Sequence, residues 1–128
     1  MFVKKFLPFI LWTGVIFALC SMPGKAIPKI NWLELLSFDK FVHASMFFVE
    51  QILLMRALIS LQEESFLNKN YKWISVLFCV AYGGSLEIMQ YYVFSERSGD
   101  VLDFIANSTG CLIGLFVFKP LSKKIKYL

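Results

Sequence analysis

The chain has 128 residues, of which 58% are hydrophobic, with a net charge of +4 and a mean hydropathy of +0.65. This composition excludes an ordinary soluble domain, because several helix-length windows lack the polar face that a surface helix needs. The basic residues stand at the ends of the apolar segments and in the terminal tail. Lipid headgroups therefore explain the charge better than nucleic acid does, and no nucleic-acid motif is present.

Four apolar segments approach the length of about 20 residues that a helix needs to cross a bilayer. In chain order they cover approximately residues 6–22, 41–61, 73–92 and 101–118. The first segment follows Lys4 and Lys5 and in this respect resembles a signal peptide. The residues before Cys20 make a poor cleavage site, so we expect the segment to be retained as a helix. The sequence predicts a single all-α membrane domain over residues 1–128, built as a four-transmembrane-helix bundle.

The connections and cysteines support this division. Pro23, Gly24 and Pro28 block continuation of the first helix, residues 62–72 form a polar loop, and residues 93–100 form a tight turn. Each of the three cysteines lies within or at the end of a separate segment. None forms a CxxC pair, so we expect buried small apolar side chains rather than a disulfide or a zinc site.

The lysines predict the orientation of the bundle. Four spans place both termini on one side, and that side holds more basic residues than the other. Basic residues are enriched in cytoplasmic loops, so we predict an N-in/C-in protein of the bacterial cytoplasmic (inner) membrane. The predicted cytoplasmic residues are Lys4, Lys5, Lys69, Lys72, Lys119, Lys123, Lys124 and Lys126.

Ionisable residues interrupt three of the apolar segments at the predicted outer ends. Such residues are costly at membrane depth, so their placement indicates a function. Helical spacing puts them on three inward-facing stripes, in which Gly110 and Gly114 allow a neighbouring helix to approach closely. The stripes are Asp39–His43–Glu50, Gly83–Glu87–Gln90 and Asp103–Asn107–Gly110–Gly114.

Several of these residues have a structural explanation as well as a functional one. Asp39 can cap the second helix. His43, the only histidine, is either a packing hydrogen-bond partner or a proton acceptor or ligand. Glu50, deeper on the same face, is either a neutral acid bonded between helices or part of a proton relay. Arg97 is either a solvated loop residue or an anion-binding residue.

The ordered pattern resembles the VanZ-like family of small bacterial membrane proteins. The resemblance covers almost the whole chain and includes the Ser21–Gly24 exit from the first helix. Glu50 falls outside the pattern. The positions that match, and that form the candidate polar site, are Asp39, Lys40, His43, Glu87, Gln90, Arg97, Asp103 and Asn107. The family takes its name from an accessory protein in glycopeptide resistance, associated with teicoplanin, so the resemblance implies an envelope-associated role.

Three functions remain open, beside a role of the polar residues in fastening the bundle. The first is an accessory or binding protein whose outer polar site holds membrane lipid, an anionic headgroup or a cell-wall precursor. The second is a membrane-embedded enzyme acting on a lipid-linked substrate, in which His43 forms an acid–base pair with Glu87 or Asp103, or in which carboxylates and the one histidine hold a divalent metal. The third is a proton-coupled transporter subunit, which would need a homo-oligomer. We expect no cofactor and no metal, because one histidine gives a thin ligand set, and we lean against an enzyme because no activated nucleophile is identifiable.

Overall fold

Helices account for nearly all of the protein. The computed structural model describes residues 2–21, 32–92 and 101–124, with side chains for all of these except residues 32–39. These ranges contain five helices and no strand: α1 (Phe2–Cys20), α2 (Trp32–Ile59), α3 (Phe66–Lys69), α4 (Tyr71–Tyr92) and α5 (Val101–Lys124). The predicted all-α class with four membrane-length helices is confirmed, because α1, residues Lys40–Ile59 of α2, α4 and α5 are all long and apolar enough to cross a membrane.

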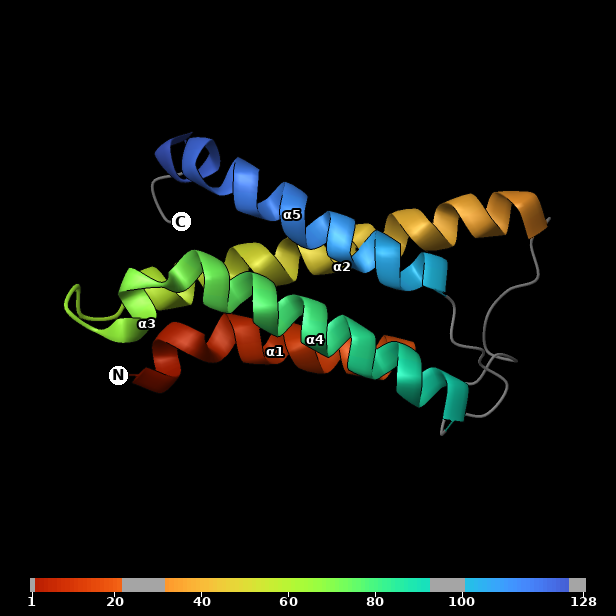
Figure 1. Ribbon diagram of the computed structural model, residues 1–128, viewed down its shortest axis with the longest axis horizontal. Coiled ribbons are helices and arrows are strands. Elements are labelled where there is room, and N and C mark those ends of the chain that lie inside the picture. Colours follow the sequence, from red (N-terminus) through yellow and green to blue (C-terminus); the bar gives the residue numbers. More distant parts are fainter. Residues whose placement is uncertain (1, 22–31, 93–100, 125–128) are drawn as a thin grey trace.

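The four long helices run up and down in chain order. Figure 1 shows α1 beginning and α5 ending at the same end of the bundle, beside the short helix α3. The start of α3 is capped by Ser65, whose hydroxyl accepts a hydrogen bond from the backbone N–H of Asn68 at 3.2 Å. The Asn68 amide in turn donates to the carbonyls of Ile59 and Leu61, and so closes the end of α2.

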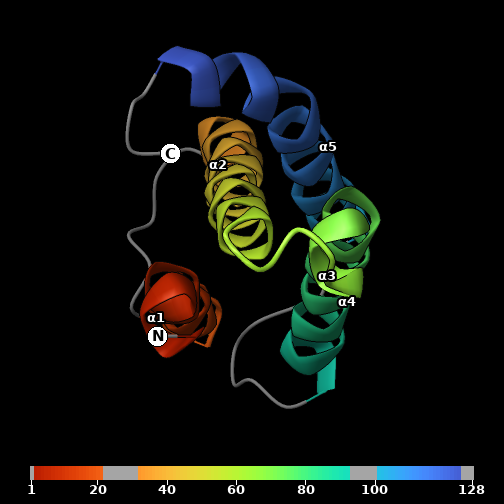
Figure 2. The same cartoon turned by 90° about the vertical axis from the view of Figure 1, so that its left-hand side faces the viewer.

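Helix α2 is the centre of the bundle. It contacts every other helix, and the view along the bundle in Figure 2 shows it between α1 and α5. Of its apolar span 56% is buried, against 6% for α1, which therefore presents most of its surface to lipid. The core formed around α2 includes Phe47, Met55, Leu86 and Ile16.

Polar contacts fasten the exposed helix α1 to its neighbours. The Trp12 indole Nε1 donates to the carbonyl of Met46 at 2.9 Å, and the Thr13 hydroxyl lies 2.7 Å from Glu50 Oε1. From α4, the Tyr82 hydroxyl donates to the Thr13 carbonyl at 2.9 Å. Interhelical hydrogen bonds of this kind hold a helix whose apolar side chains gain little by leaving lipid.

The closest approach in the bundle is between α2 and α5, at Gly110. A Cβ atom on Gly110 would lie 2.1 Å from the carbonyl oxygen of Ala44, so only glycine fits there. Gly114 is the next tight position, 3.0 Å from the Gln51 side chain by the same measure. This contact sets the spacing of the two helices one turn away from the polar residues described next.

Candidate functional site

A partly buried ion pair links α2 and α5 near the end of the bundle opposite α3. The Lys40 ammonium contacts the Asp103 carboxylate, which lies in the first turn of α5 and is 7% exposed. A carboxylate in that turn is stabilised by the free N–H groups and the dipole of the helix. The pair brings together two of the candidate residues, which are 63 positions apart in the sequence.

One turn deeper, a buried hydrogen bond joins His43 to Asn107. His43 Nδ1 lies 3.0 Å from Asn107 Oδ1, and both residues are almost completely buried. Since the amide oxygen is an acceptor, Nδ1 carries the hydrogen and Nε2 is the ring atom that faces Asp103, 3.9 Å from its Oδ2. The close approach of α2 and α5 at Gly110 brings the His43 and Asn107 side chains within hydrogen-bond distance.

Glu87 brings the third helix, α4, into the group. One ligand atom from each of His43, Glu87 and Asp103 lies within 4.8 Å of the other two, and all three residues are buried. We call Lys40, His43, Glu87, Asp103 and Asn107 the polar cluster. With both carboxylates ionised and His43 neutral, one ammonium stands against two carboxylates and the cluster carries a net charge of −1.

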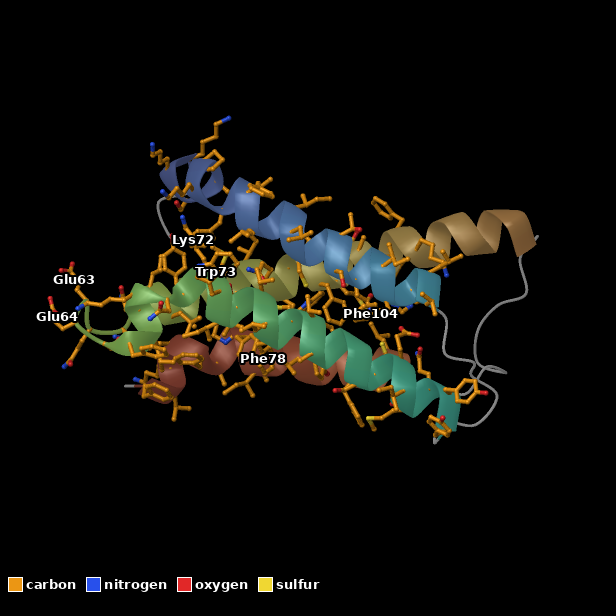
Figure 3. All side chains as sticks on the ribbon, in the orientation of Figure 1. Glu63, Glu64, Lys72, Trp73, Phe78 and Phe104 are labelled. Atoms are coloured by element: carbon orange, nitrogen blue, oxygen red, sulfur yellow. The ribbon has the colours of Figure 1, made fainter. Side chains whose placement is uncertain are left out.

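A groove between α4 and α5 meets the polar cluster at Glu87. It has a volume of about 410 Å³ and is lined by Gly84, Glu87, Ile88, Tyr91, Tyr92, Val101 and Phe104. Figure 3 shows Phe104 between the two helices, where its ring lies 3.3 Å from the place of a Cβ on Gly84. Ile88, Tyr91, Tyr92 and Val101 are exposed on the bundle surface, so the groove faces lipid in a membrane. Glu87 is the one acidic residue among the described residues that line it.

Two inward-facing candidates lie elsewhere in the bundle. Gln90 donates through Nε2 to the carbonyl of Cys20 at 3.1 Å, and so ties the end of α1 to α4. Glu50, on the same stripe of α2 as His43, contacts Thr13 of α1 instead of α5. The side chain of Asp39, together with Arg97 and the residues from Met22 to Gly24, lies outside the described residues.

Some polar residues that form contacts between helices were not singled out from the sequence. Thr13 meets both Glu50 and Tyr82, while Gln51 donates to the Ser75 hydroxyl at 2.8 Å between α2 and α4. The position of these residues within apolar segments could have identified them as interhelical contacts, because a hydrogen-bonding side chain at membrane depth requires a partner. The three cysteines are all buried, as expected.

Comparison with known proteins gives one match. A model of the VanZ/LLP1 family matches residues 5–123, which is nearly the whole chain. No curated protein and no solved structure matches. The match includes every residue of the polar cluster and of the groove.

Proposed function

Because the chain belongs to the VanZ/LLP1 family and has four helices of membrane-spanning length, we propose that it is an accessory protein of the bacterial cytoplasmic membrane that binds a phosphate-bearing envelope lipid. The lipid chain lies in the α4–α5 groove, and the head reaches the polar cluster. Anionic phospholipids and lipid-linked cell-wall precursors share this chemistry, and the experiments below distinguish them.

The observation that carries the proposal is the position of Glu87. This carboxylate belongs to the polar cluster and also forms part of the wall of an otherwise largely apolar, lipid-facing groove. Ligand sites typically combine an apolar surface with a few placed polar groups. A lipid is the ligand class that offers a long apolar chain and a polar head to such a site from within the membrane.

The distribution of charge supports an outward-facing site. The ends of α1 and α5 that lie beside α3 carry Lys4, Lys5, Lys123 and Lys124, whereas the polar cluster lies toward the opposite end of the bundle. If the lysine-rich end is cytoplasmic, as the positive-inside rule favours, the polar cluster lies near the outer face of the membrane. Lipid-linked precursors of the cell wall are used on that face.

The binding test uses purified protein in nanodiscs of neutral phosphatidylcholine with a photoreactive polyprenyl phosphate as probe. We expect cross-linking to peptides of α4 and α5. Gly84→Leu fills the groove and should lower the cross-linked fraction about tenfold, whereas Gly14→Leu, at a glycine with nothing within 4 Å, should leave it unchanged. Equal cross-linking in the two variants would reject the groove as the binding site.

Two further probes separate the possible ligands. A polyprenol that lacks the phosphate should compete weakly if the head binds the polar cluster. Phosphatidic acid should compete as well as the polyprenyl phosphate if the phosphate alone is recognised, and poorly if the isoprenoid chain is required. Competition by all three to the same extent would mean that the groove binds apolar chains without recognising a head.

The resemblance to an accessory protein of teicoplanin resistance extends the proposal to glycopeptide antibiotics. A deletion strain should become more sensitive to teicoplanin, and wild-type protein should restore resistance. His43→Ala should fail to restore it while reaching the membrane in the same amount. Full rescue by His43→Ala would show that the polar cluster has no part in the phenotype.

A membrane-embedded enzyme is the second candidate, and one distance favours it. His43 Nε2, which carries the lone pair of the neutral ring, lies 3.9 Å from Asp103 Oδ2, and a neutral imidazole held in one orientation can act as a general base. To distinguish an enzyme from a binding protein, the nanodiscs are incubated with polyprenyl phosphate or polyprenyl diphosphate, and the lipid is then analysed by mass spectrometry. An altered lipid that disappears with His43→Ala would favour the enzyme over the binding protein.

A further inference from the structure

Three potential metal ligands converge in the polar cluster from three different helices. His43 of α2, Glu87 of α4 and Asp103 of α5 each direct one ligand atom into a space in which these atoms lie within 4.8 Å of one another. A single histidine predicts too few ligands for a metal, but the fold adds two buried carboxylates to it. We propose that these three side chains bind a divalent metal ion, Zn²⁺ or Mn²⁺.

The hydrogen bond between His43 and Asn107 prepares the ring for this role. Because Nδ1 donates to Asn107 Oδ1 at 3.0 Å, the lone pair of a neutral ring is on Nε2, the atom that faces Asp103. Histidines that bind metals almost always donate their other ring N–H to an oxygen in this way, which fixes the tautomer and the orientation of the ring. Asn107 is therefore the positioning residue of the site.

A second observation comes from the other atom of the Asn107 amide. Asn107 is 1% exposed, and among the described residues its Nδ2 has no hydrogen-bond partner. This N–H group lies 3.3 Å from the place of a Cβ on Gly83, one turn along α4 from Glu87. A buried donor without a partner is unfavourable. Water or a phosphate oxygen bound to the metal ion would accept its hydrogen bond.

The charge of the described cluster explains how a cation would help it to hold a phosphate. The described cluster carries a net charge of −1 with both carboxylates ionised, which opposes a phosphate. A divalent ion changes this charge to +1 and binds the phosphate directly, as metal ions held by carboxylates commonly do. This step rests on the proposed function, whereas binding of the metal itself does not.

The distances are compatible with metal coordination after small side-chain movements. Bonds of about 2.1 Å to nitrogen and oxygen place the ligands of a tetrahedral ion about 3.4 Å apart. The three atoms lie within 4.8 Å of one another, so they close by about 1.4 Å or less. Three protein ligands also leave at least one position for a ligand from outside.

Lys40 gives the proposal its sharpest test. Its ammonium contacts the Asp103 carboxylate and so competes with the metal ion for that ligand. Lys40→Met removes the competitor and should tighten metal binding, although it removes an ion pair. A cluster that only holds the helices together has no reason to bind a metal more tightly after this substitution.

The test is isothermal titration of purified protein in detergent with ZnCl₂ or MnCl₂ alone, supported by elemental analysis after dialysis. We expect one ion per chain for at least one of the two metals. His43→Ala and Glu87→Gln should each weaken binding at least about tenfold, and Asn107→Ala about 10- to 100-fold. Glu50→Gln is the matched control, because this carboxylate is also buried but contacts Thr13, and the metal affinity of this variant should equal that of wild type.

Three results would overturn the inference: no bound ion in folded wild-type protein, equal losses in Glu50→Gln and Glu87→Gln, or weaker binding in Lys40→Met. Circular dichroism of each variant verifies that it retains its helices. Metal binding without lipid binding would refute the proposed function alone, and lipid binding without a metal would refute this inference alone. Asp103→Asn is an unsuitable variant, because it would remove the carboxylate that the Lys40 ammonium contacts.

Discussion

The contact between Gly110 and Ala44 should control both the stability of the bundle and the geometry of the polar cluster. In Gly110→Ala, the new Cβ would lie 2.1 Å from the Ala44 carbonyl oxygen, whereas ordinary contact begins at 3.4 Å. The Ala44 carbonyl is part of the backbone, so it cannot relieve the clash by changing rotamer as a side chain can. Helices α2 and α5 must therefore move apart by about 1.3 Å near this position.

This displacement has a predictable energy. Overpacking costs up to about 3 kcal/mol, and a lost hydrogen bond between membrane helices costs about 0.6 kcal/mol. The exchange of glycine for alanine within a helix returns about 1 kcal/mol. We expect a net loss of up to about 2.6 kcal/mol. The His43–Asn107 distance, now 3.0 Å, would increase beyond the hydrogen-bond limit, since an opening of this size brings it to about 4 Å.

The assay is reversible unfolding in mixed micelles with increasing SDS, followed by helical circular dichroism. Gly14→Ala is the matched control, because nothing lies within 4 Å of a Cβ at Gly14, and this variant should equal or slightly exceed wild type in stability. Gly114→Ala should lie between the two, since part of its clash is with the flexible side chain of Gln51. A Gly110→Ala protein as stable as Gly14→Ala would refute the close approach of α2 and α5.

Three other predictions concern the remaining contacts and the orientation. Thr13→Val removes the hydroxyl that meets Glu50 Oε1 at 2.7 Å, so the same unfolding assay should show a loss of about 0.6 to 1.7 kcal/mol; no loss would contradict the α1–α2 contact. Gln90→Leu removes the hydrogen bond to the Cys20 carbonyl and should lower stability by a similar amount without changing zinc or lipid affinity, whereas a lost affinity would place Gln90 in the site. Alkaline phosphatase fused to the C-terminus should be inactive and a fluorescent protein bright, while active phosphatase would reverse the predicted orientation.

The helical framework is predictable from the sequence because each membrane helix satisfies its own backbone hydrogen bonds. An apolar run of sufficient length is therefore enough to indicate a membrane helix. Two details were not predicted. Helix α2 begins at Trp32, ahead of the apolar segment that starts near residue 41. This start was not predicted, because residues 32–40 are too mixed in polarity to indicate a membrane span. The four-residue helix α3 depends on a local cap by Ser65 within a loop, and so short a segment has no hydrophobic period.

The sequence predicts that the polar residues face inward, but not which helix each one meets. Spacing by four and seven residues groups His43 and Glu50 on one face of α2, yet His43 contacts α5 and Glu50 contacts α1. The reason is that α2 is surrounded by the other helices, so one stripe borders different neighbours at different depths. The groove could not be predicted either, because Tyr91 and Tyr92 are also typical of an interfacial aromatic belt.

This division along α2 allows function to be separated from folding by mutation. Substitutions at Thr13 or Glu50 alter the attachment of α1 to α2, deeper along α2 than the polar cluster, whereas substitutions at His43 or Asn107 alter the cluster itself. Both groups remove buried hydrogen bonds of similar strength, so a stability assay alone cannot distinguish them. Metal affinity can, because it should respond to His43 and Asn107 and not to Glu50. Lys40 provides a second distinction. If the polar cluster is a cation site, Lys40 lowers the metal affinity because its ammonium holds the Asp103 carboxylate. A cluster that only joins helices gives no reason for Lys40 to affect metal affinity.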